Sequence, residues 1–590
     1  MSPHEEYSRR LQEREGRVSR LERLHIQLGN IRLAVFAAGI VLAVLALRHS
    51  ISWWWIVAPL VAFVVLAIRH SRVIHTRTCA ERAATVYRNG LARIEDRWAG
   101  TGETGERFYD THHVYAGDLD LFGPGSLFEL LSTCRTRIGE NTLASWLLGR
   151  ATEQETADRH NSVEDLRDRL DFREDLAVLG EDARTGVHPE ALLRWAQSNV
   201  APTPVAFRIA AAGLAIAAIG LAVLWGVNGL AAPFVAIVLV EGAAAYGMRK
   251  RIEAVTHSAE HAFADLKLLQ QVVARLEREK FSSVHLLRLH KDLHHHKLRA
   301  SRAIAKLSTL VDLVMSRDNL FLRVFDIPLL YSVQVTFALE RWQREYGHDI
   351  GTWLDAVGEM EALISIATYR YEHPHDAVPK FVSETCFEAT ELGHPLLPMD
   401  KCVRNDVKLG APGTAILVSG SNMSGKSTLL RSVGIATVMA MAGAPVRANA
   451  LTLSPLQVGA SIRVNDSLQE GASRFYAEIT RLRKIFDLAS AQPALLFLLD
   501  ELLQGTNSAD RRVGAEGLLR ALLDRGAIGL VTTHDLALTD IAGPMHQRLQ
   551  NKHFQDELSE GRIRFDYKLR EGVVTKSNGL ELMRSIGLEV

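Results

Sequence analysis

Residues 420–428 have the types and spacing of a phosphate-binding loop. They read Gly-Ser-Asn-Met-Ser-Gly-Lys-Ser-Thr, follow the apolar run Thr414–Ser419 and precede a helical pattern. The glycines let the backbone curl so that its N–H groups and the N-terminus of the next helix face phosphate oxygens. We expect Lys426 to neutralise the β and γ phosphates and Ser427 to ligate Mg²⁺. The predicted nucleotide contacts are Gly420, Ser421, Asn422, Met423, Ser424, Gly425, Lys426, Ser427 and Thr428.

Two further strand ends supply acids and a histidine. The apolar run Ala494–Leu499 ends in Asp500 and Glu501, and the run Ala527–Thr532 leads to His534. We expect Asp500 to hold the Mg²⁺ shell and Glu501 to polarise the attacking water as a general base. The histidine could sense the γ-phosphate or orient the water. Paired acids at a strand end are otherwise usually a solvated turn, but a phosphate-binding loop upstream argues against that interpretation here.

These motifs need a parallel sheet to bring them together. From about Gly393 the sequence alternates short β-branched runs, glycine turns and helical stretches, which is typical of an α/β domain. Upstream, residues 118–179 and 252–313 keep apolar residues at three- and four-residue spacing. The predicted fold is therefore an α/β P-loop NTPase domain that follows an all-α region.

Four apolar runs come in two pairs with short connectors: Leu33–Leu47 with Ile51–Ile68, and Ile209–Trp225 with Leu230–Tyr246. At about 1.5 Å per residue they span roughly 23 to 27 Å, the lower limit for a bilayer core. Arginines flank both pairs, so we expect two transmembrane hairpins in the inner (cytoplasmic) membrane, with the soluble domains in the cytoplasm. Buried helices of a soluble protein remain the alternative. Glu241 is the one acid inside a run, and its role stays open.

Composition narrows the function classes. A chain of 590 residues is long enough for several domains with their own cores. Lysine plus arginine equals aspartate plus glutamate at 68 each, so net charge gives no support for a polyanion partner. The four cysteines show no CxxC pair or zinc-like spacing, which favours free thiols in a reducing compartment and no metal cluster.

A histidine-rich segment, 290–296, lies within a basic helical face. A solvated helix surface and a phosphate-contacting face both fit this pattern. A metal site at His290 and His294 fits less well, because no carboxylate or cysteine completes it.

The nucleotide-site motifs resemble those of the MutS family. The loop at 420–428 carries that family's Asn-Met pair, 500–507 is similar to its Walker B segment with the following loop, and the pair 533–534 is similar to its histidine switch. Residues 465–478 resemble its signature segment, whose serine completes the partner's site in MutS dimers. The resemblance therefore implies that Ser473 acts in trans.

The resemblance extends beyond the site. Residues 393–397 and 576–580 match family segments on either side of the motifs, and 126–146 with 353–371 resemble the core and lever helices. The front of the chain departs from the family, because apolar helices occupy the region of the mismatch-reading domain with its Phe-x-Glu. The tripeptide at 172–174 reads Phe-Arg-Glu but lies in the lever segment, where we interpret it as a coincidence.

Two other departures concern the loop and the clamp. Ser421 and Ser424 replace a proline and a glycine of the usual family loop, changes that a P-loop tolerates. The second apolar hairpin interrupts the path from the lever toward the family's DNA clamp, which puts a clamp in doubt.

The resemblance implies an ATPase that uses ATP and Mg²⁺, forms a homodimer with composite sites, and binds DNA in mismatch repair or recombination, and the apolar hairpins add the expectation of a membrane anchor. The alternatives are a transporter-type ATPase, which would lack its LSGGQ-type signature here, and a nucleotide-gated membrane scaffold that does not act on DNA. The predicted segments are a basic cytoplasmic N-terminal part at 1–32, transmembrane hairpins at 33–68 and 205–247, helical core and lever at 69–200 and 252–385, and the MutS-type ATPase domain at 386–590.

Overall fold

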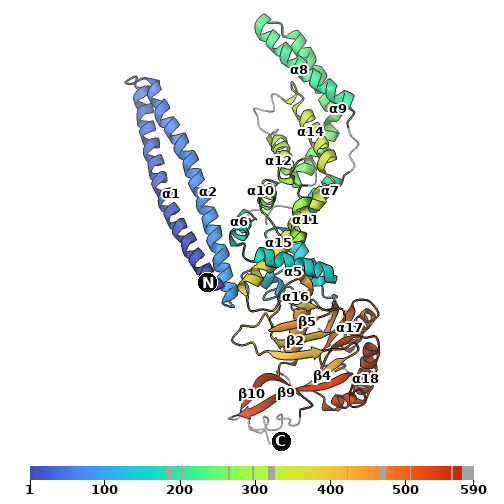
Figure 1. Cartoon of the computed structure of the whole chain (residues 1–590). Helices are drawn as coiled ribbons and strands as arrows, with labels where there is room; N and C mark the ends of the chain where they lie inside the picture. The colour runs from blue at the N-terminus through green and yellow to red at the C-terminus, as the bar shows by residue number, and fades with distance from the viewer. Residues whose placement is uncertain are drawn as a thin grey trace. The chain divides into compact units, whose positions relative to one another are not determined.

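The computed structural model divides into two compact units that share one chain (Figure 1). Unit 1 contains Met1–Ser132, Leu143–Asp168 and Leu363–Val590, and unit 2 contains Thr133–Thr142 and Arg169–Ala362. Each unit is therefore built from segments that are distant in the sequence. The structure describes residues 1–180, 189–198, 203–262, 266–294, 298–316, 326–421, 423–463, 474–504, 506–559 and 562–574.

A six-stranded sheet forms the centre of unit 1, in the order β10-β9-β4-β8-β7-β6. All neighbours are parallel except the β10–β9 pair. Every residue of β4, β6 and β8 is buried, which explains why these strands lack the alternation of a sheet with one face in water. The three strands predicted before the site motifs are confirmed. The strands are β4 (Ala415–Ser419), β6 (Leu456–Ser461), β7 (Ala494–Leu499), β8 (Ile528–Thr533), β9 (Leu549–Ser559) and β10 (Arg562–Glu571).

A second sheet has the order β1-β5-β2-β3. Its strands are β1 (Lys380–Phe381), β2 (Phe387–Leu392), β3 (Asn405–Leu409) and β5 (Ala450–Leu453). Three helices follow strands of the main sheet: α16 (Lys426–Ala442), α17 (Arg474–Leu488) and α18 (Ser508–Asp524). Leucines of α17 and α18 pack with β4, β7 and the 3-10 helix η3 (Leu536–Ala542) in one apolar core. The mixed α/β fold expected for this region is confirmed.

Residues 106–132 and 143–168 add helices to unit 1: η2 (Glu106–Phe108), α3 (Leu127–Leu131), the second half of α4 (Arg137–Leu148) and α5 (Glu153–Arg167). The α5 helix lies against the end of α16, where Arg159 donates to the carbonyl of Met441 (3.1 Å). A Cβ at Gly443 would lie 2.5 Å from Cβ of Arg159, so only glycine permits this approach. The helical segment is thereby held on the nucleotide domain within unit 1.

The first apolar pair belongs to two much longer helices, α1 (Pro3–Leu47) and α2 (Val57–Ile94), which are joined through η1 (Trp53–Ile56). The apolar runs occupy the ends next to the connector, and the remaining turns of both helices carry polar residues. The segment 1–32, expected only as a basic stretch, continues the same helix from a capping box at Ser2 and Glu5. We call the polar part of this antiparallel pair the stalk.

The base of the stalk contacts the end of α15 (Ile350–Glu372) within unit 1. The ring of Tyr7 lies 5.5 Å from the rings of Tyr87 and Tyr371. Arg93 donates to both carboxylate oxygens of Glu372 at 2.6 and 2.7 Å. A Cβ at Gly90 would lie 2.5 Å from Cε2 of Tyr7, so the glycine makes room for that ring.

A polar chain crosses the stalk where it meets the apolar runs. Nη1 of Arg32 lies 2.8 Å from Nδ1 of His70, and Nε2 of His70 lies 2.7 Å from Nδ1 of His25. Because a guanidinium only donates, Nδ1 of His70 must be the acceptor and Nε2 must carry the proton that His25 accepts.

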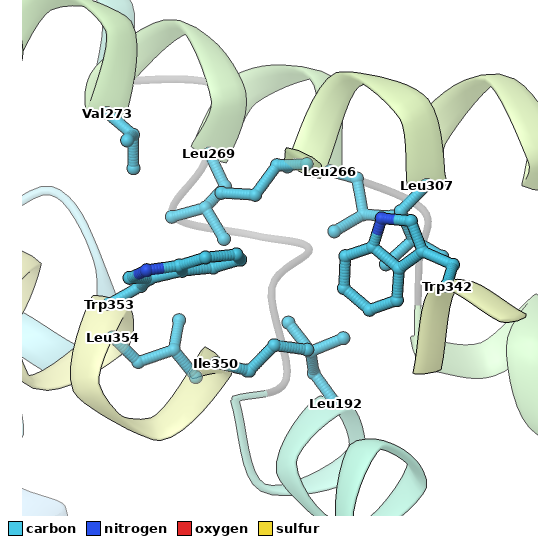
Figure 2. A pocket seen from close by; sticks show the side chains of 10 residues that line it. Leu192, Leu266, Leu269, Val273, Leu307, Trp342, Ile350, Trp353 and Leu354 are labelled. Carbon is cyan, nitrogen blue, oxygen red and sulfur yellow. The ribbon is translucent and has the colours of Figure 1, made fainter. Parts of the chain in front are cut away.

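Unit 2 is helical, as the sequence predicts. Trp342, Trp353 and leucines of several helices enclose an apolar cavity of about 10 Å³ (Figure 2). A cavity of this size holds at most one water and is part of the packed core. The described helices that lie wholly in unit 2 are α6 (Leu170–Gly180), α7 (Pro189–Gln197), α8 (Val205–Asn228), α9 (Ala232–Ala262), α10 (Leu266–Leu276), α11 (Val284–Asp292), α12 (Ala300–Ser316) and α14 (Tyr331–Tyr346), and the first half of α15 joins them.

The second apolar pair forms α8 and most of α9, which pack on each other and on α14. Near the polar ends of these helices, the buried carboxylate of Glu340 in α14 accepts hydrogen bonds from Arg208 of α8 (3.0 Å), Arg251 of α9 (2.7 Å) and the hydroxyl of Thr203 (3.1 Å). In α9 the carboxylate of Glu241 is fully buried and has no hydrogen-bond partner. Among the described residues, four helices are long and apolar enough to cross a membrane, judged by length and composition alone: Pro3–Leu47, Trp53–Ile94, Val205–Asn228 and Ala232–Ile252.

The described part of the histidine-rich segment makes local contacts. Nε2 of His290 pairs with the carbonyl of Glu277 (3.1 Å), and Nδ1 of His294 pairs with the carbonyl of His290 (2.7 Å). Residues 295–297 lie outside the described residues. His290 and His294 therefore form hydrogen bonds with backbone carbonyls, near the end of α11.

Candidate nucleotide site

The phosphate-binding loop connects β4 to α16 at the carboxyl edge of the main sheet. Gly425 has a φ of +101°, a conformation that disfavours any side chain. Lys426 is 4% exposed, and its ammonium donates to the carbonyls of Gly420 and Ser421, both at 2.8 Å. Burial lowers the pKa of Lys426, and the carboxylates of Glu501 and Asp500 oppose that shift. The lysine is therefore held at the loop, where a phosphate could take the place of the carbonyls.

Two hydroxyls of the loop lack partners. The Oγ atoms of Ser421 and Ser424 are buried without a hydrogen bond. A buried polar group without a partner costs about 1–3 kcal/mol. Such groups in one loop indicate a place arranged to receive hydrogen-bonding atoms from a ligand. Met423 is 85% exposed at a φ of +71°, and Thr428 lies in the first turn of α16.

A hydroxyl and a carboxylate meet where Mg²⁺ is expected. Ser427 donates to Oδ2 of Asp500 at 2.6 Å. The hydroxyl of Thr532, at the end of β8, donates to Oδ1 of Asp500 and accepts from the N–H of Glu501 (3.0 Å). Mg²⁺ prefers hard oxygen ligands, commonly one or two carboxylates with phosphate and water. The donor set at Ser427 and Asp500 fits this ion.

The predicted base and the predicted histidine also lie together. Oε1 of Glu501 is 3.4 Å from Nδ1 of His534, and the amide of Gln504 contacts both side chains, at 3.2 Å from the histidine. Glu501 has a φ of +52°, so its backbone is held in an uncommon conformation at the strand end. The carboxylate remains partly exposed and can reach water.

Sequence reasoning missed the residues that hold this loop. Glu478 of α17 accepts from the N–H of Leu503 (2.7 Å), and Arg511 of α18 donates to the carbonyls of Leu503 and Gln504 (both 3.1 Å). Gln504 stands three residues after Glu501, a spacing that could have suggested its contact. Nothing in the local pattern could have identified Thr532, because its role depends on the pairing of β7 with β8.

Tyr567 was missed as well. Cδ1 of its ring lies 3.2 Å from the position that a Cβ would take at Gly425, so the aromatic ring borders the loop. Asn405 holds this part of β10, since its amide donates to the carbonyl of Tyr567 (2.9 Å) and its oxygen accepts from the N–H of Leu569 (2.8 Å). The pairing of β9 and β10 is irregular between Phe565 and Leu569, which no sequence motif marks.

The structure thus brings Lys426, Ser427, Asp500, Glu501 and His534 to one edge of one sheet. Two predicted residues, Asn422 and Ser473, lie outside the described residues, as do the segments 464–473 and 575–590. Their roles stay predictions.

Comparison with known proteins finds similarity over the part of the chain that carries these residues. Residues 416–589 match the family model described as MutS domain V. The chain is 36% identical over 203 residues to Endonuclease MutS2 of Thermus thermophilus, covering 34% of this chain and 26% of that protein. It is 33% identical over 244 residues to DNA mismatch repair protein MSH3 of Phaeosphaeria nodorum, covering 39% and 21%. It is 30% identical over 258 residues to DNA mismatch repair protein MutS 2 of Haloarcula marismortui, covering 40% and 27%.

The similarity spans only about a quarter of the length of these relatives. The domain match and the relatives show that residues 416–589 are similar to MutS domain V, a P-loop ATPase-type domain.

Proposed function

We propose that this protein is a membrane-anchored, Mg²⁺-dependent ATPase of the MutS type. The observation that carries the proposal is the convergence of three neighbouring strand ends. The loop after β4 holds Lys426 and Ser427, β7 ends in Asp500 and Glu501, and β8 ends next to His534. Lysine, hydroxyl, two acids and histidine at one sheet edge are the groups that phosphoryl transfer to water requires.

Each side chain has a task that follows from its position. Lys426 and the loop N–H groups bind the β and γ phosphates, while Ser427 and Asp500 would hold Mg²⁺, which neutralises charge on the phosphate oxygens. Glu501 orients the attacking water and accepts its proton. Gln504 and His534 fix the direction of the Glu501 carboxylate. The ring of Tyr567 lies beside the loop and is 42% exposed, so we propose that a nucleotide base stacks on it.

We propose that two copies pair through the nucleotide domains. Large apolar side chains are exposed on elements that follow the carboxyl ends of the sheet strands. Met423 (85% exposed) lies in the loop after β4, Tyr476 (66%) in α17 after β6, and Val513 (73%) in α18 after β7. Burial of these side chains against a partner would remove apolar surface from water. A partner there would complete composite sites, with Ser473 as the residue that acts in trans.

We propose further that both apolar pairs cross the membrane as hairpins. Their helices have the required length and composition, and side chains such as Phe36, Ile40, Val64, Ile216 and Leu239 are exposed in the structure. Lipid would cover these side chains, and the arginine-rich flanks would stay in the cytoplasm.

The link to DNA comes from the relatives, two of which are named as mismatch repair proteins. We propose that the ATP state is coupled to DNA binding in mismatch repair or recombination. Mobility shifts at low salt with duplex, mismatched and branched DNA test this part. No affinity for any of these forms would favour a membrane ATPase that acts without DNA.

The decisive experiment is hydrolysis by the purified full chain in nanodiscs. We expect Mg²⁺-dependent phosphate release that Lys426→Ala lowers about 100-fold or more, because the substitution removes the charge that stabilises the transferring phosphate. Release that survives this substitution would come from a contaminant or another site and would refute the proposal.

A further inference from the structure

Asp118 ties the segment before α3 to two elements of the nucleotide domain. Its side chain is 2% exposed. Oδ1 accepts from the N–H groups of Ile462 (2.8 Å) and Arg463 (2.6 Å), directly after β6, and Oδ2 accepts from Arg481 of α17. One carboxylate therefore holds the end of the edge strand and the helix that follows it.

The same residue holds the helix of the phosphate-binding loop. The guanidinium Nε of Arg431 donates to the carbonyl of Asp118 at 3.0 Å. Next to it, Leu119 packs so closely on α16 that a Cβ at Gly434 would lie 2.6 Å from Cδ2 of the leucine. The segment around Asp118 is thus fitted to α16 by a hydrogen bond and by shape.

Both connections lead to the residues expected to hold Mg²⁺. The carbonyl of Ser461 accepts from the N–H of Asp500 (2.9 Å), and Ser461 directly precedes Ile462, which Asp118 holds. Arg431 stands one helical turn after Ser427 on α16. The two contacts of Asp118 therefore act on the two sides of the Ser427–Asp500 pair.

We propose that Asp118 is a positioning residue for Mg²⁺, which sets the distance between Ser427 and Asp500 and connects the helical segment beyond it to the nucleotide site. The inference rests on the proposed ATPase function. Residues that orient metal ligands typically change metal affinity or activity about 10- to 100-fold when they are replaced. A movement of residues 114–121 would be transmitted to Ser427 and Asp500 through the same contacts.

A merely structural ion pair would behave differently, and the chain offers one for comparison. Glu372 is also buried in unit 1 and also binds an arginine, Arg93, but it lies at the base of the stalk. Loss of either carboxylate should destabilise the fold. Only the loss of Asp118 should change the response to Mg²⁺.

The experiment compares Asp118→Asn with Glu372→Gln in the full chain. The readouts are the Mg²⁺ concentration for half-maximal hydrolysis and the binding of a fluorescent ATP analogue, with and without Mg²⁺. For Asp118→Asn we expect the half-maximal Mg²⁺ concentration to rise about 10-fold, with binding of the analogue in the absence of Mg²⁺ unchanged. Glu372→Gln should keep the wild-type Mg²⁺ response. An unchanged response in Asp118→Asn, or an equal shift in Glu372→Gln, would overturn the proposal.

A second variant covers the case in which Asp118→Asn does not fold. Arg431→Lys leaves every bond of the Asp118 carboxylate in place and removes the planar guanidinium that reaches its carbonyl. We expect a smaller shift of the Mg²⁺ response in the same direction, and no shift would refute the role.

The measurements distinguish failure of the proposed ATPase function from failure of the proposed role of Asp118. A wild-type chain without Lys426-dependent hydrolysis would reject the ATPase. The Mg²⁺ dependence of analogue binding would then still decide whether Asp118 positions the ion.

Discussion

The phosphate-binding loop and the base of the stalk both bury polar side chains in unit 1, but only one of them leaves such groups open. At the stalk, Arg93 and Glu372 satisfy each other with two hydrogen bonds. At the loop, the hydroxyls of Ser421 and Ser424 have no partner, and Lys426 is bound to carbonyls of its own loop. Burial of charge alone thus does not identify a site. Unused bonding capacity beside a lysine, a hydroxyl and two acids does indicate one, because buried polar groups in native structures usually have a partner.

The largest expected effect tests the loop side of this comparison. Glu501→Gln should reduce the turnover number about 1,000-fold, because it removes the general base while the amide keeps the shape of the side chain. Nucleotide binding and the unfolding temperature should stay at wild-type values. Single-turnover phosphate release and equilibrium binding measure the two properties. A variant that fails to bind nucleotide would give Glu501 a structural role, as at the stalk.

The next largest effect concerns the stalk. Glu372→Ala leaves Arg93 buried without its carboxylate, which should cost about 3 kcal/mol. Amide hydrogen exchange of residues 87–94 measures the free energy of opening of this contact. Hydrolysis per folded molecule should not change. A loss of hydrolysis at wild-type stability would mean that the stalk takes part in the reaction.

A smaller effect is expected where shape rather than charge holds the stalk. Gly90→Ala places a methyl group 2.5 Å from the ring of Tyr7 and should destabilise the contact by about 2 kcal/mol through overpacking. Gly16→Ala is the matched control, because a Cβ at Gly16 of α1 would meet nothing within 4 Å. That control should be neutral or slightly stabilising, since alanine favours helix over glycine. Exchange in residues 5–20 and 80–94 reports both variants.

The smallest effect is the sharpest test of unused hydrogen-bonding capacity. Ser421→Ala and Ser424→Ala remove buried hydroxyls that have no partner, so the nucleotide-free protein should be as stable as wild type or more stable. Affinity for ATP should fall about 5-fold for each, the equivalent of roughly 1 kcal/mol for one hydrogen bond. Thermal unfolding and titration calorimetry measure the two changes. A destabilised apoprotein with unchanged affinity for ATP would mean that these serines stabilise the fold, as Arg93 and Glu372 do, and do not bind the nucleotide.

Local sequence predicts the parts of the site that one strand and one loop determine. β4, β7 and β8 were expected because each is a short apolar run with chemistry at its end, and parallel pairing places those ends together. The contacts that depend on other elements were not predictable. Gln504 meets His534 only because β7 and β8 are neighbours, and Asp118 meets Arg481 across 363 residues of sequence.

The two apolar helix pairs also have a part that the sequence predicts and a part that it does not. The apolar runs identified four helices, since composition alone marks such segments. Their length was underestimated at the first pair, because polar turns of α1 and α2 are helical through contacts with each other and with Tyr371. Tertiary packing decides the conformation of such polar stretches, and a local pattern carries little information on it.

The chain of Arg32, His70 and His25 across the stalk has a consequence for the effect of acid. Nδ1 of His70 accepts from the guanidinium of Arg32 while Nε2 of the same ring donates to His25, so His70 must be uncharged for the chain to exist. A proton taken up at Nδ1 of His70 would set two donors against each other. The stalk therefore keeps this connection between its two helices only while the surrounding solution leaves His70 neutral.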